Sequence, residues 1–425
     1  MQNPYVVIIF ASLLIVFSYL FTQISKYTKI PSVIFLIGTG VAGQFAVKYF
    51  GINIPDLGQY LGLLGVVGLM MIVLEGALDI KIHRNKIRTI LAALATSIII
   101  LGVTNSLIAS IIYFTQNSAF LDAFLFAIPL SVVSSAIVIP SVHTLIPAKK
   151  EFMILEATLS DIFGIMLFAF WIKDPAEGQT YFEAISLNVV ISVGLSVLLS
   201  YFLVYIFHKI NTEIKFFLFL AILALLFSVG EYFHYSALLI ILIFGLVLNN
   251  THAFFKGFLK KLINKEKVTE IRNEFVMITN ETSFLIRTFF FVMFGLTMNL
   301  EGLFDVEAII ISCLIMLVIF LTRALNLKVF LKSTIFPQML IAPRGLVTIL
   351  LFNKIVEHHG FVPFNEAILA WVIIGTNLIM MFGLIASGSN EDDILRINVG
   401  DASSTQLDYN PDNHSSNLDE NISAE

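Results

Sequence analysis

Apolar blocks of about 20 residues alternate with short polar segments along most of the chain. Blocks of this length suit helices that span a hydrocarbon core of about 30 Å. Strands of a membrane barrel would alternate in polarity within each block, and these blocks do not. Breaking them at proline, glycine and charge clusters predicts thirteen spanning helices, near 4–22, 31–50, 57–77, 88–114, 119–146, 153–172, 182–207, 214–231, 236–250, 281–300, 306–325, 335–356 and 365–386.

The composition agrees with a protein that folds in lipid. Apolar residues make up 58% of the 425 residues and charged residues 13%, against about 45–50% and about 25% in soluble domains. The single cysteine, Cys313, excludes a disulfide framework. The predicted fold class is therefore an all-α membrane protein, with residues 1–388 as its transmembrane domain.

Lysine and arginine residues predict the orientation. Nearly all of those in loops follow odd-numbered spans, whereas only Lys48, Lys173 and Lys354 fall in the even-numbered segments. The positive-inside rule then places the N-terminus outside and the C-terminus in the cytoplasm. In this distribution Arg323 belongs to the cytoplasmic segment after the eleventh span.

Two segments lie outside the predicted spans. The Lys-rich stretch 251–280 predicts a cytoplasmic helix that links the two halves, and a solvated linker near anionic lipid explains it equally well. Residues 389–425 are rich in Ser, Asn and Asp, hold Arg396 as their one base, and predict a disordered acidic tail.

Five ionisable side chains fall inside predicted spans, where each costs at least about 2.5 kcal/mol: Glu75, Glu156, Asp161, Arg287 and Arg344. Three acids and two bases allow two neutral pairs and leave one carboxylate. Glu156 and Ser160 share a helix face, whereas Asp161 is rotated about 100° from Ser160. We interpret Glu156 as half of a structural ion pair and Asp161 as the functional acid. The alternative for Asp161 is a structural pair with Arg287.

Two of the predicted spans contain helix-breaking residues. Span five reads IPLSVVSSAIVIPSVHTLIP, with Ser134 and Ser135 ahead of a mid-membrane proline, and span twelve reads IAPRGLVTILL, where Pro343 and Gly345 flank Arg344. Interrupted spans in both halves of a transporter indicate a binding site at the membrane midplane. A simple kink explains each proline taken alone.

Several function classes lack their chemistry in this sequence. It shows no Walker loop, no zinc-ligand spacing and no nucleophile–base set, so an ATP-driven pump or an intramembrane protease is not predicted. We expect a transporter rather than an enzyme, with no cofactor and with neither nucleotide nor nucleic acid as a partner.

The motifs resemble those of the monovalent cation:proton antiporter superfamily, the sodium/hydrogen exchanger family and its electroneutral branch above all, over roughly 1–388. VIFLIGTGVAGQ and LGLLGVVGLMMIVLEGALDI resemble its second and third spans, LEATLSDIFG its Glu–x–x–x–Asn–Asp span, APRGLV its arginine-bearing crossing helix and FLIRTFFFVMFGLTMNL a later span. Two departures are Ser160 in place of asparagine, and Ser134–Ser135–Ala136 in place of the Thr–Asp–Pro of sodium exchangers. They favour one-for-one exchange and put sodium selectivity in doubt.

The resemblance implies inverted repeats, two broken crossing helices, and a core domain that moves against a dimerisation domain. It also implies a homodimer in the cell inner membrane that serves pH homeostasis. A direct pair between Glu156 and Arg344, fixing spans six and twelve, is likewise implied by the resemblance.

The mechanism we hypothesise has Asp161 bind either a proton or a dehydrated cation, Na⁺ or K⁺, so that the two compete for one charge. Ser134, Ser135 and unwound carbonyls would complete an oxygen shell, to which Ser160 could add a hydroxyl. Glu75 would reach the site through water, and Arg287 would balance charge when the ion leaves.

Three alternatives belong to other classes. A proton-uncoupled cation channel needs acid rings or a carbonyl filter, and no filter-like repeat is visible. A non-transporting receptor would signal through a tail that is short and featureless here. An organic-anion carrier would use Arg287 or Arg344 as a substrate ligand, and it predicts that Arg344 has no acidic partner.

Overall fold

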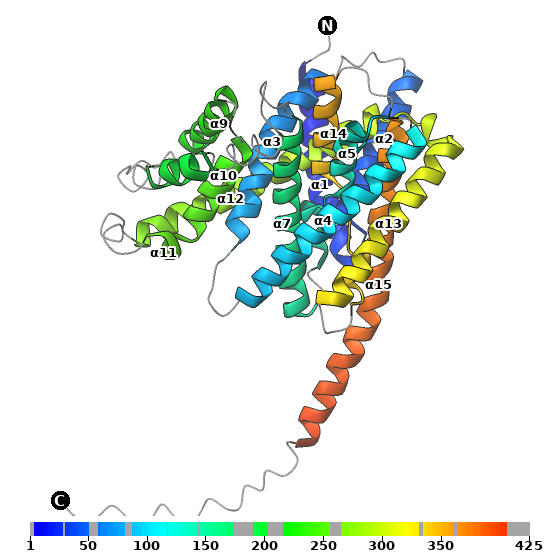
Figure 1. The fold of residues 1–425 in the computed structure, drawn as a ribbon. Helices are drawn as coiled ribbons and strands as arrows, with labels where there is room; N and C mark the ends of the chain where they lie inside the picture. The colour runs from blue at the N-terminus through cyan, green and yellow to red at the C-terminus, as the bar shows by residue number, and fades with distance from the viewer. Residues whose placement is uncertain are drawn as a thin grey trace, which may run out of the picture.

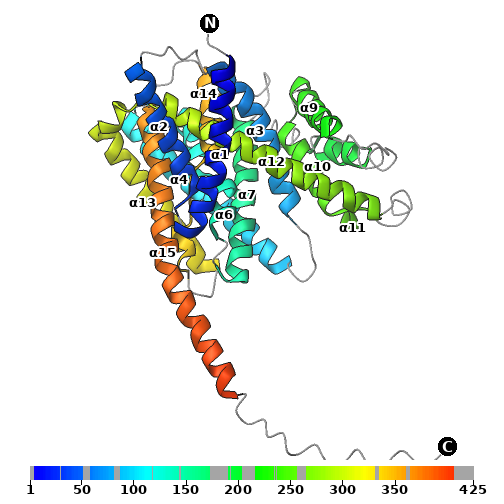
Figure 2. The same ribbon diagram turned by 180° about the vertical axis from the view of Figure 1, so that it is seen from behind.

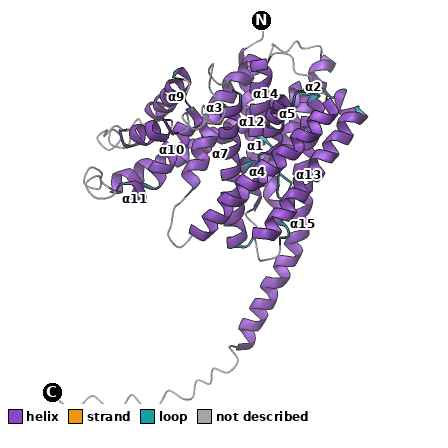
Figure 3. Ribbon diagram, in the orientation of Figure 1, coloured by secondary structure: helices purple, strands orange, loops and turns teal. Residues whose placement is uncertain are grey.

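The structure is a computed structural model. It describes residues 4–28, 30–50, 58–80, 87–116, 118–142, 145–172, 190–191, 193–202, 216–233, 235, 237–255, 265–330, 335–359 and 364–405. Throughout these ranges the regular elements are helices, and no strand occurs (Figure 3). The predicted all-α fold is confirmed.

Helices lie at every predicted span. The first half contains α1 (Pro4–Thr28), α2 (Ser32–Phe50), α3 (Gly58–Asp79), α4 (Ile87–Gln116), α5 (Phe120–Ser131), α6 (Ser135–Ser141) and α7 (Pro147–Trp171). The second half contains α9 (Phe216–Tyr232), α10 (Ala237–Asn249), α11 (Thr251–Phe254), α12 (Lys265–Thr297), η4 (Gly302–Phe304), α13 (Val306–Phe330), η5 (Gln338–Leu340), α14 (Leu346–His359) and α15 (Glu366–Thr405). The seventh span, 182–207, is described only at 190–191 and 193–202. Among the described residues, eight helical segments are long and apolar enough to cross a membrane alone.

The helices pack in two groups (Figures 1 and 2). The scaffold group consists of α1, α2, α3, α9, α10 and α12, and the core group of α4, α5, α6, α7, α13, α14 and α15. Contacts between the groups are sparser, and they join α3 to α7 and α14, α10 to α7, and α12 to α14. This division matches the predicted arrangement of a core domain beside a second domain.

Small residues bring the scaffold helices close together. A Cβ placed on Gly40 of α2 would lie 2.8 Å from Cα of Gly295 on α12. On the other side of the group, a Cβ on Gly245 of α10 would lie 2.6 Å from Cβ of Ala77 on α3. Close backbone approach of this kind favours helix association in lipid through van der Waals packing. Lipid tails are as apolar as the helices, so no hydrophobic effect drives the association there.

Two segments differ from their predicted ends. α12 starts at Lys265 and runs without interruption into the tenth span, so part of the predicted linker and that span form one helix. α15 continues to Thr405, so the first part of the segment predicted as a disordered tail is helical, and it projects from the bundle in Figure 1. Residues 406–425 lie outside the described residues.

Candidate functional site

The fifth span is interrupted at residues 132–134, between α5 and α6. Because the helix is unwound here, three consecutive backbone N–H groups lack helical hydrogen bonds. In lipid each of them needs another acceptor. Each one has it: Val133 N–H donates to Ser160 Oγ at 3.0 Å, Ser134 N–H to Pro343 O at 3.0 Å, and Ser135 N–H to Asp161 Oδ2 at 2.9 Å. The predicted break therefore exists, and its geometry is held by α7 and by the twelfth span.

Asp161 lies on α7 directly against this break and is 4% exposed. Its Oδ2 accepts hydrogen bonds from the backbone N–H and the hydroxyl of Ser135, at 2.9 and 2.5 Å. Its Oδ1 is buried and has no hydrogen-bond partner among the residues that the structure describes. The charged groups that act on Asp161 from other elements are Glu75 and Arg344. One carboxylate oxygen is therefore fixed by the fold, and the other remains available to a ligand.

Residues 341–345 interrupt the twelfth span, between η5 and α14. Arg344 in this segment is fully buried, and its Nε and Nη1 donate to the carbonyls of Leu130, at 2.5 Å, and Ala342, at 3.1 Å. Leu130 is in the last turn of α5, where the helix dipole places partial negative charge, so the guanidinium balances that helix end. From α15, Thr376 Oγ1 accepts the Arg344 N–H and Asn377 donates to the Arg344 carbonyl.

The two interrupted segments touch where they cross. A Cβ on Gly345 would lie 2.8 Å from Ser134 Oγ and 2.5 Å from Cδ1 of Ile137. Only a residue without a side chain allows this approach, which explains the glycine after Arg344. Ser134 Oγ is buried here, and no described residue forms a hydrogen bond with it. The predicted serines and the predicted arginine thus meet around one crossing.

Glu156 pairs with Arg323, and the predicted direct pair with Arg344 is wrong. Arg323 Nη2 lies 2.8 Å from Oε2 of Glu156 and its Nη1 lies 3.1 Å from Oε1, so both carboxylate oxygens are engaged. The pair joins α7 to α13, and both side chains are almost completely buried. Assigning Arg323 to a cytoplasmic segment was an error, because α13 continues to Phe330 and carries this residue into the core group.

Glu75 on α3 pairs with Arg287 on α12, with Nη1 lying 3.0 Å from Oε2 and 3.2 Å from Oε1. The pair is partly open, with 13% and 19% of the two side chains exposed. The alternative that Arg287 is the partner of Asp161 is therefore wrong. Of the three acids predicted inside spans, Asp161 is the one that the described residues leave without an ion pair.

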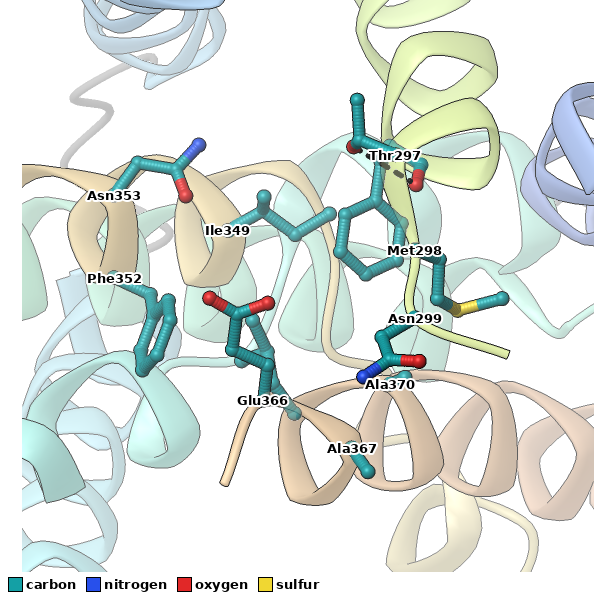
Figure 4. A pocket seen from close by; sticks show the side chains of 11 residues that line it. Thr297, Met298, Asn299, Ile349, Phe352, Asn353, Glu366, Ala367 and Ala370 are labelled. Atoms are coloured by element: carbon teal, nitrogen blue, oxygen red, sulfur yellow. Dashed lines mark hydrogen bonds between the residues drawn. The ribbon is translucent and has the colours of Figure 1, made fainter. Parts of the chain in front are cut away.

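A pocket with both apolar and polar lining residues lies at the boundary of the two helix groups. It is lined by the end of α12, one face of α14 and the start of α15, and Figure 4 shows the carboxylate of Glu366 pointing toward Ile349 and Phe352 of α14. Ile349 is about one turn along α14 from Gly345, so the pocket begins just beyond the crossing. Asp161 does not line it.

Sequence reasoning missed three residues of the site. Thr376 and Asn377 stand as a polar pair inside the apolar thirteenth span, and this pair is the sequence signal that points to them. Arg323 sits near the end of an apolar block that also carries Lys328, so position alone suggested a membrane surface.

Two unwound segments that cross within a helical membrane bundle, beside an acid without an ion pair, define a secondary transporter of the broken-helix type. A family model described as "Sodium/hydrogen exchanger, transmembrane" matches residues 12–395. The chain belongs to that family and is a multi-pass cation:proton antiporter.

Solved structures show the same fold. The sodium proton antiporter MjNhaP1 from Methanocaldococcus jannaschii, determined at pH 8, matches with a TM-score of 0.67 at 20% identity, over 92% of this chain and 100% of that one. An electron-microscopy map of the same protein matches with a TM-score of 0.61 at 20% identity, over 91% and 96%. A search of curated proteins finds no significant match.

Proposed function

We propose that the protein exchanges one monovalent cation, Na⁺ or K⁺, for one proton, and that the two compete for Asp161. The observation that carries this proposal is the state of the three acids predicted inside spans. Glu75 and Glu156 each face an arginine, whereas Asp161 keeps one buried oxygen without a partner. Removal from water favours the protonated carboxyl, and a bound cation favours the carboxylate. Binding one ligand therefore expels the other.

Oxygen atoms around the crossing support a cation as the second ligand. Asp161 Oδ1 and Ser134 Oγ are both buried and have no hydrogen-bond partner within the described ranges. Ser135 and Ser160 already hold the break, because Ser135 donates to Asp161 and Ser160 accepts from Val133. In our proposal Ser134 coordinates the ion directly, while the other two serines position the carboxylate and the unwound backbone.

A single carboxylate supports an electroneutral cycle. It carries one cation in one direction and one proton in the other, so the full cycle moves no net charge across the membrane. Arg344 stays fixed by backbone carbonyls, so it adds no moving proton. Clamping the membrane potential should leave the exchange rate unchanged, as measured by pH-gradient dissipation with and without valinomycin and potassium. A clear voltage dependence would show that a second charge moves.

The structural setting supports alternating access between the two helix groups. The core group carries both breaks and Asp161, and the pocket beside Glu366 opens between α12 of the scaffold group and α14 of the core group. We propose that this pocket is the outer end of the access route. The proposal also places the protein as a homodimer in the cell inner membrane, with its N-terminus outside and its C-terminus in the cytoplasm.

The test replaces Asp161 by asparagine in proteoliposomes that carry a pH gradient. Asp161→Asn should insert and purify like the wild type, yet lose cation-dependent proton flux for Na⁺, K⁺ and Li⁺ added in turn. Asp122→Asn is the matched control, because Asp122 is an exposed acid in the first turn of α5. Full exchange in Asp161→Asn would end the proposal.

One observation on Arg344 agrees with the alternative of an organic-anion carrier. Arg344 has no ion pair within the described residues, as an organic-anion carrier predicts. Its guanidinium is fully buried and is held by two backbone carbonyls at the ends of interrupted helices, which accounts for its position without a substrate. The same proteoliposomes, loaded with a labelled carboxylate, would show anion flux that survives Asp161→Asn if the protein were such a carrier.

A further inference from the structure

Thr158 differs from eight other threonines in the described helices. These eight donate their hydroxyl to the carbonyl four residues earlier, as helical threonines commonly do: Thr22, Thr28, Thr39, Thr115, Thr288, Thr297, Thr322 and Thr376. Thr158 is 1% exposed, and its Oγ1 has no hydrogen-bond partner among the described residues. Thr96, Thr279 and Thr348 share this state, but none of them lies on the helix of Asp161.

The position of Thr158 places it beside the proposed ion site. It precedes Asp161 by three residues on α7, which puts the two side chains about 60° apart around the helix and about 4.5 Å apart along it. A Cβ on Gly76 of α3 would lie 2.9 Å from Cγ2 of Thr158, so the threonine side chain packs against α3. Glu75, the preceding residue on α3, acts electrostatically on Asp161. Thr158 therefore lies where α7 packs against α3 of the scaffold group, about one turn before Asp161.

Three oxygen atoms, two beside the first break and one about a turn before Asp161 on α7, share one property. Asp161 Oδ1, Ser134 Oγ and Thr158 Oγ1 are all buried, none has a hydrogen-bond partner in the part of the chain that the structure describes, and their residues are 1–4% exposed. A buried polar atom without a partner calls for a water molecule or an ion. The three come from the break and from α7, and oxygen ligands of this kind suit a hard cation.

We propose that the hydroxyl of Thr158 is a ligand of the transported monovalent cation. This inference rests on the proposed exchange at Asp161 and adds a specificity-determining residue to it. The cation would lie on the α3 side of α7, held by the carboxylate of Asp161, with Ser134 contributing from the break and Thr158 from the same helix as the acid. Thr158 thereby strengthens cation binding without adding a proton-binding group.

The test uses an isosteric change that removes only the oxygen. Thr158→Val keeps the branched side chain that packs on Gly76, and Thr158→Ser keeps the hydroxyl. In proteoliposomes Thr158→Val should raise the KM for Na⁺ or K⁺ about tenfold, because contacts with a charged partner are of that strength, while the maximal rate stays within about twofold. Thr158→Ser should retain a KM close to that of the wild type.

A pH profile separates a ligand from a packing residue. At a subsaturating cation concentration, weaker cation binding lets protons outcompete the cation up to a higher pH. The pH dependence of the exchange rate in Thr158→Val should therefore shift to more alkaline pH. Thr104→Val is the matched control, because the Thr104 hydroxyl is buried against Thr322 in the core group. It should change thermal stability and leave both the KM and the pH profile in place.

The outcomes distinguish this inference from the proposed function. An unchanged KM and pH profile in Thr158→Val, together with lost exchange in Asp161→Asn, would overturn the role of Thr158 and leave the exchange site intact. Retained exchange in Asp161→Asn would overturn both. A raised KM in Thr158→Ser equal to that in Thr158→Val would also contradict the proposal, because it would show a packing effect.

Discussion

The two intramembrane ion pairs differ in how much water reaches them. Glu156 and Arg323 are 0% and 1% exposed at their side chains, whereas Glu75 and Arg287 are 13% and 19% exposed. A buried pair adds little net stability over an apolar replacement, but removing one partner leaves an uncompensated charge. The first pair should therefore be the more sensitive to single substitution.

Replacing Arg323 by methionine should destabilise the protein by about 3–5 kcal/mol, because it leaves the buried Glu156 carboxylate without its partner. The measurement is the thermal unfolding midpoint of the purified protein in detergent. Arg287→Met is the matched comparison, and its loss should be clearly smaller because Glu75 remains partly hydrated. The double variant Glu156→Leu with Arg323→Met should recover most of the loss. Equal midpoints for Arg323→Met and the wild type would contradict this account.

Residue identities predicted which intramembrane acid lacks an ion pair better than they predicted its neighbours. A count of buried charges leaves one acid over, and within the described residues Asp161 has no ion pair, because Glu156 pairs with Arg323 and Glu75 with Arg287. The partner of Glu156 was mispredicted because a base near the end of an apolar block looks the same from the sequence whether it faces lipid headgroups or a neighbouring helix. Only the packing of α13 on α4 and α15 decides between the two.

At the scale of elements, the two interrupted spans stabilise each other. The Ser134 N–H donates to the Pro343 carbonyl, so each break satisfies part of the polar backbone that the other exposes. The charge of Arg344 lies at the end of α5, and Asp161 accepts from the first backbone N–H of α6. Neither break would be stable alone in lipid, because unsatisfied backbone groups cost several kcal/mol each there.

Replacing Gly345 by alanine should abolish exchange while allowing insertion. The added Cβ would meet Ser134 Oγ at 2.8 Å and Ile137 at 2.5 Å, which forces the two breaks apart. The measurement is cation-dependent proton flux, normalised to the amount of protein in the vesicles. Gly102→Ala on α4 is the control, because a Cβ there meets nothing within 4 Å. Wild-type flux in Gly345→Ala would show that the crossing tolerates separation.

The second break could be predicted from Pro343 and Gly345, which lie in it and weaken a helix. The first break was predicted from Ser134 and Ser135 ahead of Pro140, but that proline lies inside α6, so the unwound residues themselves contain neither proline nor glycine. The contacts that α15 makes with the second break could not be predicted. Thr376 and Asn377 hold Arg344 by its backbone N–H and carbonyl, and such contacts depend on which helix packs beside the second break. The order of apolar blocks along the chain does not contain that information.

At the scale of the whole molecule, each of the two intramembrane ion pairs lies within one helix group. Glu75 and Arg287 both belong to the scaffold group, and Glu156 and Arg323 both belong to the core group. Within the described residues, neither intramembrane ion pair crosses the boundary. Contacts across it use small or apolar residues, such as Gly65 of α3 against Leu350 of α14. A sliding motion would therefore break neither of these two ion pairs.

Cross-linking the groups to each other should stop exchange, whereas cross-linking within one group should not. In a Cys313→Ser background, Gly65→Cys with Leu350→Cys joins α3 to α14, because a Cβ on Gly65 would lie 2.9 Å from Leu350 Cδ2. Ala77→Cys with Gly245→Cys joins α3 to α10 within the scaffold group. Oxidation should abolish proton flux in the first pair, and reduction should restore it.

The Ala77→Cys, Gly245→Cys pair shows how oxidation affects flux when the disulfide does not join the two helix groups. Its flux should remain near that of the reduced protein, since α3 and α10 move together if the scaffold group is rigid. Disulfide formation is followed in both pairs by the shift in electrophoretic mobility, so that an unreacted pair is not mistaken for a tolerant one. Full flux in a completely oxidised Gly65→Cys, Leu350→Cys protein would mean that the groups do not move apart at this contact. Transport would then have to proceed by local rearrangement of the two interrupted spans alone.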